Sequence, residues 1–100
     1  MSHLIMYLAA GVAETAAKYR PGAKHAMLIY VYTDNLDAAA EDAVEAAERN
    51  GWVHLELRRA KELDPDPSEI ADDILRDAAQ CAVSEGSAIV VYADEIPHDA

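Results

Sequence analysis

The sequence predicts a small α/β domain with a three-stranded sheet in the order strand, helix, strand, helix, strand, preceded by an N-terminal helix. Three observations lead to this prediction. Two short runs are apolar on both faces, one run alternates between apolar and polar residues, and alanine-rich segments with helical spacing separate the runs. The 100 residues contain no repeat or linker, so we expect a single domain over residues 1–100. The alternative is an α+β, ferredoxin-like fold in which residues 4–9 form an additional strand.

Residues 2–20 fit a helix better than a strand. Their apolar side chains recur at helical spacing, with Ser2 as a possible N-cap and Pro21 as the terminator. The apolar stripe consists of Ile5, Leu8, Val12, Ala16 and Tyr19. Gly11 would cost about 1 kcal/mol inside such a helix, but the length of the pattern favours a helix all the same.

The next two elements are a strand over residues 26–33 and a helix over residues 36–49. The strand is a continuous apolar run with aromatic and β-branched members, which is typical of a strand buried on both faces. Asp34 or Asn35 can cap the helix that follows. Gly51 lies just after the end of this helix, where a left-handed residue is favoured.

Residues 52–61 alternate between apolar and polar side chains, which predicts a strand with one apolar and one mixed face. Val53, Leu55 and Leu57 lie on the apolar face in this interpretation, and Trp52 lies on the mixed face. A mixed face suits the edge of a sheet. We therefore expect this strand at an edge and the two doubly apolar strands inside or beside the middle.

The second long helix is predicted to begin near residue 66 and to end at about residue 84. Asp66 is a natural N-cap, Pro67 fits the first helical position, and Glu69 completes a capping box. The stripe expected to be buried consists of Ile70, Ile74, Leu75, Ala78, Ala82 and Val83. A final apolar strand is expected over residues 88–93.

The charge balance excludes several kinds of partner. Nineteen acidic residues and 8 Lys or Arg residues give a formal net charge of −11, which would repel the phosphates of a nucleic acid. The single cysteine, Cys81, excludes an internal disulfide and offers no metal-ligand spacing. The apolar run at residues 4–12 is too short to cross a bilayer, and no Lys or Arg precedes it. We expect no nucleic-acid or membrane partner and a cytoplasmic location.

No catalytic or cofactor motif is evident, so the sequence predicts no catalytic, cofactor-binding or metal-binding residues. The pattern closest to an active site is His54 beside Glu56, with Tyr30 and Tyr32 on a neighbouring strand. A histidine next to a carboxylate can act as a general base, and a tyrosine can act as a donor. An alternating row of this kind is also typical of a partly exposed edge strand, which is the interpretation we favour.

Two surfaces are candidates for binding. The candidate interaction face combines aromatic and charged strand residues: Tyr30, Tyr32, Trp52, His54, Glu56 and Arg58. The candidate acidic face consists of carboxylates at helical spacing: Asp37, Glu41, Glu45, Glu48, Glu69, Asp73 and Asp77. Like charges one turn apart destabilise a helix by roughly a few tenths of a kcal/mol. The acidic stripes are therefore either ordinary solvated surface, which we favour, or a binding face for a basic partner.

We expect a non-enzymatic, acidic protein-interaction or regulatory module that self-associates or binds another protein and needs no cofactor. One alternative is a small-molecule-binding domain or enzyme that uses His54 and Glu56. Another is an acidic inhibitor, such as an immunity-type protein, that binds a basic partner. A pocket lined by His54 and Tyr30 would favour the first alternative, and carboxylates along one continuous face would favour the second.

Overall fold

The computed structural model describes residues 2–16, 18–63, 66, 68 and 70–96. Within these residues the chain forms four strands, two α-helices and a short 3₁₀ helix. In chain order they are β1 (His3–Ala13), β2 (Lys24–Thr33), η1 (Leu36–Ala38), α1 (Ala39–Arg49), β3 (Trp52–Leu63), α2 (Asp73–Glu85) and β4 (Ser87–Ile96).

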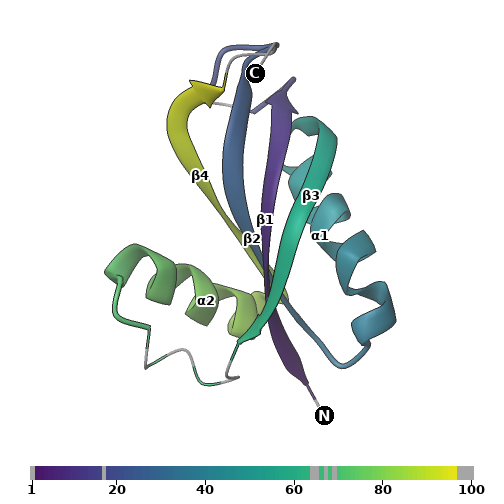
Figure 1. The fold of residues 1–100 in the computed structure, drawn as a ribbon, viewed down its shortest axis with the longest axis vertical. Helices are drawn as coiled ribbons and strands as arrows, with labels where there is room; N and C mark the ends of the chain where they lie inside the picture. Colours follow the sequence, from purple (N-terminus) through teal and green to yellow (C-terminus); the bar gives the residue numbers. More distant parts are fainter. Residues whose placement is uncertain (1, 17, 64–65, 67, 69, 97–100) are drawn as a thin grey trace.

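The four described strands form one antiparallel sheet in the order β3-β1-β2-β4. Figure 1 shows α1 and α2 on opposite sides of this sheet. The predicted three-stranded sheet with an N-terminal helix is therefore wrong. The ferredoxin-like alternative required the extra strand that is present, but its order β-α-β-β-α-β differs from the observed order β-β-α-β-α-β.

The segment predicted as a helix is β1, a central strand between β2 and β3. Its successive side chains point to opposite faces, so that Ile5 and Tyr7 pack under α1, and Leu4 packs under α2. A central strand that is covered on both faces needs apolar residues at nearly every position. Such a run also contains apolar residues at helical spacing, so the stripe that begins at Ile5 does not distinguish a helix from a buried strand.

Two apolar clusters join the helices to the sheet. The buried strand residues under α1 include Ile5, Met27, Ile29 and Val31, and those under α2 are Leu4, Leu28 and Tyr30. The fully buried helix residues of these clusters are alanines: Ala39, Ala43 and Ala47 from α1, and Ala79 and Ala82 from α2. Because alanine buries little area, the larger strand side chains supply most of the apolar surface of both cores.

β3 is irregular where it pairs with β1. The register shifts twice, opposite residues 8–9 and residues 10–12 of β1, and the second shift coincides with the positive φ of His54, 53°. A Cβ atom on Gly11 would lie only 2.9 Å from Leu55 Cδ1. Glycine at this position therefore leaves the space that the Leu55 side chain fills beside the bulge.

The bulge changes which side chains of β3 share a face. Trp52 is 2% exposed and packs under α1, in the same cluster as Leu55 and Leu57. The predicted strict alternation, with Trp52 on the opposite face from these leucines, is therefore wrong. A bulge adds one residue to one strand, so that every side chain beyond it changes face.

α2 begins later than predicted. Asp72 is its N-cap and accepts the backbone N–H three residues later at 3.0 Å. Asp66 instead accepts the N–H two residues later, also at 3.0 Å. Pro67 and Glu69, which the predicted capping box required, lie outside the described residues. Ile74 is 67% exposed, so its predicted burial is wrong.

β3 and β4 are the two edges of the sheet. The edge position of β3 agrees with its mixed face, and β4, although it is the other edge, lies beside the central strand β2. β4 is apolar on both faces because both helices reach it: Ala88 and Val90 pack toward α2, and Ile89 and Val91 pack toward the α1 cluster.

Candidate functional site

The structure does not bring the residues of the candidate interaction face together. Tyr30 and Trp52 are 1% and 2% exposed, and they belong to the apolar clusters on opposite faces of the sheet. Tyr32 is partly buried on the same face as Tyr30. Tyr30 and Trp52 are therefore parts of the core, and Trp52 reaches the surface only as part of the wall of one hollow described below.

His54, Glu56 and Arg58 lie on β3 and are exposed. Glu56 lies 3.7 Å from the Lys24 ammonium and 3.5 Å from the Arg58 guanidinium, as in ordinary surface ion pairs. Neither His54 nor Glu56 lines any of the hollows described below. The residues that could form a histidine–carboxylate active site thus lie on an open surface.

The carboxylates of the candidate acidic face do not form one continuous surface. Those on α1 and those on α2 lie on opposite sides of the sheet (Figure 1). The exposed members are Asp37, Glu41, Glu45, Glu48, Asp73 and Asp77, and Glu69 lies outside the described residues. Glu45 and Asp77 each line a hollow beside β4.

One backbone hydrogen bond shows which residues of β4 direct their N–H and C=O groups toward β2. The N–H of Tyr32 donates to the carbonyl oxygen of Gly86 at 2.9 Å, in line with the register that pairs residues 87–91 with β2. In an antiparallel ladder, hydrogen-bonded pairs alternate with pairs that are not hydrogen-bonded. Ala88 and Val90 therefore direct their N–H and C=O groups inward, toward β2.

The intervening residues Ser87, Ile89 and Val91 direct their backbone groups outward, away from β2. No strand in the described part of the chain lies on that side of β4. The outer edge of β4 thus presents a row of donors and acceptors at every second residue, which is the arrangement that pairs with an additional strand.

Two adjoining hollows of about 200 and 610 Å³ lie beside β4 between α1 and α2. A third hollow of about 350 Å³ adjoins them farther along β4 and is walled by Ala16, Lys18, Tyr19, Asn50 and Trp52. The first two share Arg49, Glu85 and Ser87, and the last two share Asn50 and Ile89. We call them together the β4 groove, which is lined by Ala16, Lys18, Tyr19, Tyr32, Asp42, Glu45, Arg49, Asn50, Trp52, Asp77, Ala78, Cys81, Glu85, Gly86, Ser87, Ala88, Ile89 and Val91.

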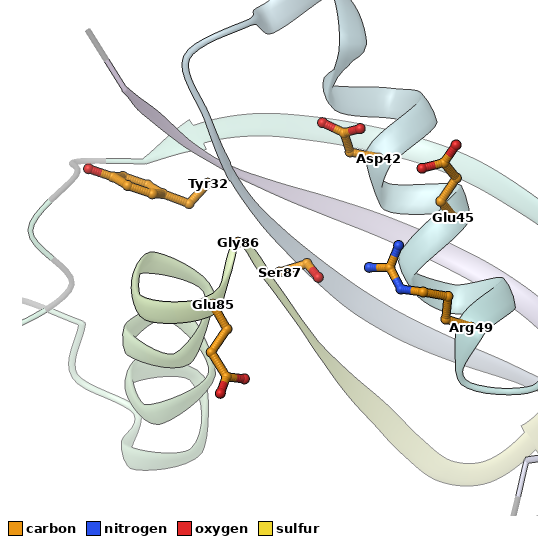
Figure 2. Close-up of a pocket in the computed structure, with 7 residues that line it drawn as sticks. All are labelled: Tyr32, Asp42, Glu45, Arg49, Glu85, Gly86 and Ser87. Atoms are coloured by element: carbon orange, nitrogen blue, oxygen red, sulfur yellow. The ribbon is translucent and has the colours of Figure 1, made fainter.

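The β4 groove is acidic at the end where β4 begins. Figure 2 shows Asp42, Glu45 and Arg49 on α1 and Glu85 at the end of α2. Asp77 lies about two helical turns before Glu85 and lines the adjoining hollow. Four carboxylates and two cations line the whole groove. This excess of negative charge favours a positively charged occupant.

The other end of the β4 groove is aromatic and apolar. The ring of Tyr19 lies 4.8 Å from the ring of His25 and 5.2 Å from that of Trp52, between centroids. His25 is buried, and its Nδ1 donates to a carbonyl oxygen of β4 at 2.9 Å. Ile89 and Val91 line the hollow with Tyr19 and Trp52, and Ala16, Lys18 and Asn50 complete it. This end therefore suits an apolar side chain.

Cys81 is exposed and lines the middle hollow. Partial desolvation raises the pKa of its thiol, and the hydrogen bond to Glu85 and the charge of that carboxylate raise it as well. The Sγ atom lies 3.6 Å from Glu85 Oε2. The thiol stays protonated near neutral pH, and a protonated thiol is a poor nucleophile.

Comparisons of the chain with family models, with curated proteins and with solved structures found no match. Neither described helix is long and apolar enough to cross a bilayer. Among the described residues, no group of three or more His, Cys, Asp or Glu side chains is placed to hold a metal ion.

The sequence alone does not indicate the β4 groove. Glu45 and Asp77 belonged to the predicted acidic face, but Glu85 and the aromatic pair of Tyr19 and His25 were not recognisable as neighbours of one strand. The available signal was the absence of charge from residues 87–91. That signal is informative only when β4 is known to be an edge strand.

Proposed function

We propose that this chain is a non-enzymatic protein-interaction module whose β4 groove binds one extended, basic segment of a partner protein as an additional strand. The observation that carries the proposal is the row of outward backbone groups at Ser87, Ile89 and Val91, which lies in a groove between two helices. Strand addition supplies affinity through the main chain and specificity through pockets for alternate side chains.

Charge supports a basic partner over a second copy of the chain. Antiparallel pairing of two β4 strands would place the α2 helices of both copies side by side, with Asp77 and Glu85 of one copy near those of the other. Like charges across an interface are costly, and each copy has a net charge of −11. Self-association, which the sequence led us to expect, is therefore the competing use of the same edge.

A direct test uses a pool of heptapeptides that all contain two Lys, one Val and four Thr in random order, with both ends blocked. A second pool has Glu in place of Lys. We expect the lysine pool to shift the amide resonances of residues 87–91 in the ¹⁵N-labelled chain, and the glutamate pool to leave them unchanged.

A pair of variants at Ile89 shows whether the backbone makes the contact. Ile89→Pro removes an outward N–H and leaves the ladder with β2 intact, because proline is tolerated on the open side of an edge strand. Ile89→Ala removes the side chain and keeps the N–H. We expect the lysine pool to bind the alanine variant and not the proline variant. Equal binding to both variants, or a peptide-free dimer that protects the same amides, would refute the proposal.

A further inference from the structure

We infer that the β4 groove selects its partner by the order of side chains: an apolar residue, two residues of any type, and then two consecutive Lys or Arg residues. This inference rests on the proposed function, because it specifies which extended segment the groove binds. It combines the register of β4 with the different chemistry at the two ends of the groove.

The strand pairing within the sheet indicates the direction in which the partner segment runs along β4. All the described strand pairs are antiparallel, and antiparallel pairing is slightly more stable per residue than parallel pairing. An added antiparallel strand therefore passes Val91 first and reaches Ser87 four residues later. This distance is about 14 Å at the usual rise per residue, and the three hollows follow the same stretch of β4.

The first position of the partner segment, opposite Val91, requires an apolar side chain. Residues directly opposite each other in an antiparallel pair point to the same face of the sheet. Val91 pairs with Met27, which lies in the cluster under α1, so the partner residue opposite Val91 points to that face too. Tyr19 and Trp52 line the hollow there.

The last two positions require positive charge, one on each face. The partner residue opposite Ala88 points toward α2, where Asp77 and Glu85 line the middle hollow. The next partner residue, opposite Ser87, points toward α1, where Asp42 and Glu45 outnumber the single guanidinium of Arg49. Adjacent residues of a strand point to opposite faces, so two consecutive basic residues satisfy both sites.

The test compares two blocked peptides of one composition. In the first, Thr-Val-Thr-Thr-Lys-Lys-Thr, the order matches the groove, and in the second, Thr-Lys-Lys-Thr-Thr-Val-Thr, it is reversed. We expect the matched peptide to bind at least about tenfold more tightly by calorimetry, which corresponds to about 1.4 kcal/mol. Equal affinities, with shifts still confined to residues 87–91, would overturn the inference and leave the proposed function standing. Binding of neither peptide at these residues would overturn both.

A charge exchange tests the position opposite Ala88. In Thr-Val-Thr-Thr-Glu-Lys-Thr, the first lysine is replaced by glutamate. We expect Asp77→Lys to weaken the matched peptide about tenfold and to strengthen this glutamate peptide. Asp73→Lys is the control for net charge, because it makes the same charge change one turn earlier on α2, outside the groove lining, although it also breaks the ion pair of Asp73 with Arg76. Equal effects of the two variants would show that only net charge matters, which contradicts a site at Asp77.

Discussion

β3 and β4 are edge strands of the same sheet, but the features that keep an edge from pairing with another chain extend along β3 and are confined in β4 to the residues after Val91, where the register shifts and Asp94 and Glu95 follow. Its register is interrupted by two irregularities, one of them at His54, and charged side chains such as Arg58, Lys61 and Glu62 line its exposed stretch. Bulges and charges of this kind are the usual protection of a sheet edge. β4 keeps a regular register over residues 87–91, with no charged residue there.

The difference between the two edges shows which residues determine the choice of a partner strand. On β3 the charges belong to the strand itself and oppose pairing with any chain. Beside β4 they belong to the flanking helices, on Glu45, Asp77 and Glu85, so the backbone stays available to a strand of the right charge. A partner has to enter between α1 and α2, which excludes a broad flat sheet more readily than a single extended segment.

The largest expected effect tests how firmly each edge is anchored. Trp52→Ala at the start of β3 should lower the free energy of unfolding by about 3–5 kcal/mol, because the ring is almost fully buried. Val91→Ala on β4 should cost at most about 2 kcal/mol, because this side chain is only partly buried. Urea denaturation of both variants measures the difference. Similar losses would mean that the β4 edge is as firmly packed as the β3 edge.

A smaller effect tests the inward and outward alternation along β4. Val90→Pro removes an inward N–H and leaves a carbonyl of β2 without its donor, which should cost about 1–3 kcal/mol. Ile89→Pro should cost less, once the loss of its side chain is measured separately with Ile89→Ala. Thermal or urea unfolding provides the comparison. If Ile89→Pro were the more destabilising of the two prolines, the register of β4 would be wrong.

Alkaline titration compares the pKa values of two buried tyrosines on the strands next to each edge, β1 and β2. Burial raises the pKa of Tyr7, beside β3, and the nearby charge of Asp42 contributes. Burial also raises the pKa of Tyr30, beside β4, with contributions from Tyr92 and Asp72. Both shifts favour the neutral hydroxyl in the folded state, so their stabilising effect is present below pH 10.0 and is lost as the pH rises through the raised values.

We therefore expect stability to fall on the alkaline side, and less steeply in Tyr30→Phe than in the wild-type chain. Stability measured by urea denaturation across this pH range, together with the tyrosinate absorbance, checks the expectation. A stability profile that is flat above pH 10.0 in the wild-type chain would contradict the burial of both hydroxyl groups.

The smallest expected effect uses Cys81 as a reporter of the β4 groove. Its thiol is exposed in the middle hollow and has a raised pKa, so alkylation should be slow near neutral pH and should accelerate toward alkaline pH. A bound lysine peptide should slow the alkylation further, because it covers the hollow. Mass spectrometry follows the modified fraction. An unchanged rate at saturating peptide would place the peptide elsewhere.

The elements with local signals could be predicted from the sequence. The strand predicted at residues 26–33 is observed at 24–33, the helix predicted at 36–49 is η1 and α1, and the strand predicted at 52–61 is observed at 52–63. In these segments the apolar pattern and the turn residues at the ends indicate the same type of element. Each element could therefore be located without knowledge of its neighbours.

The parts that depend on tertiary contacts could not be predicted. β1 is buried by helices on both faces, so its apolar run has no clear period of two, and the helical interpretation of residues 2–20 fails. The bulge at His54 depends on the space beside Gly11, and it moves Trp52 into the core. The β4 groove requires the strand order of the sheet and the placement of both helices, none of which is encoded within five neighbouring residues.

The most direct test of an open β4 edge is amide hydrogen exchange of residues 87–91, measured in the dilute free chain and with saturating lysine peptide. In the free chain we expect Ala88 and Val90 to be protected and Ser87, Ile89 and Val91 to exchange rapidly. With the peptide bound, all five amides should exchange slowly. Protection of Ser87, Ile89 and Val91 in the free chain, or their continued rapid exchange in the peptide complex, would contradict the account.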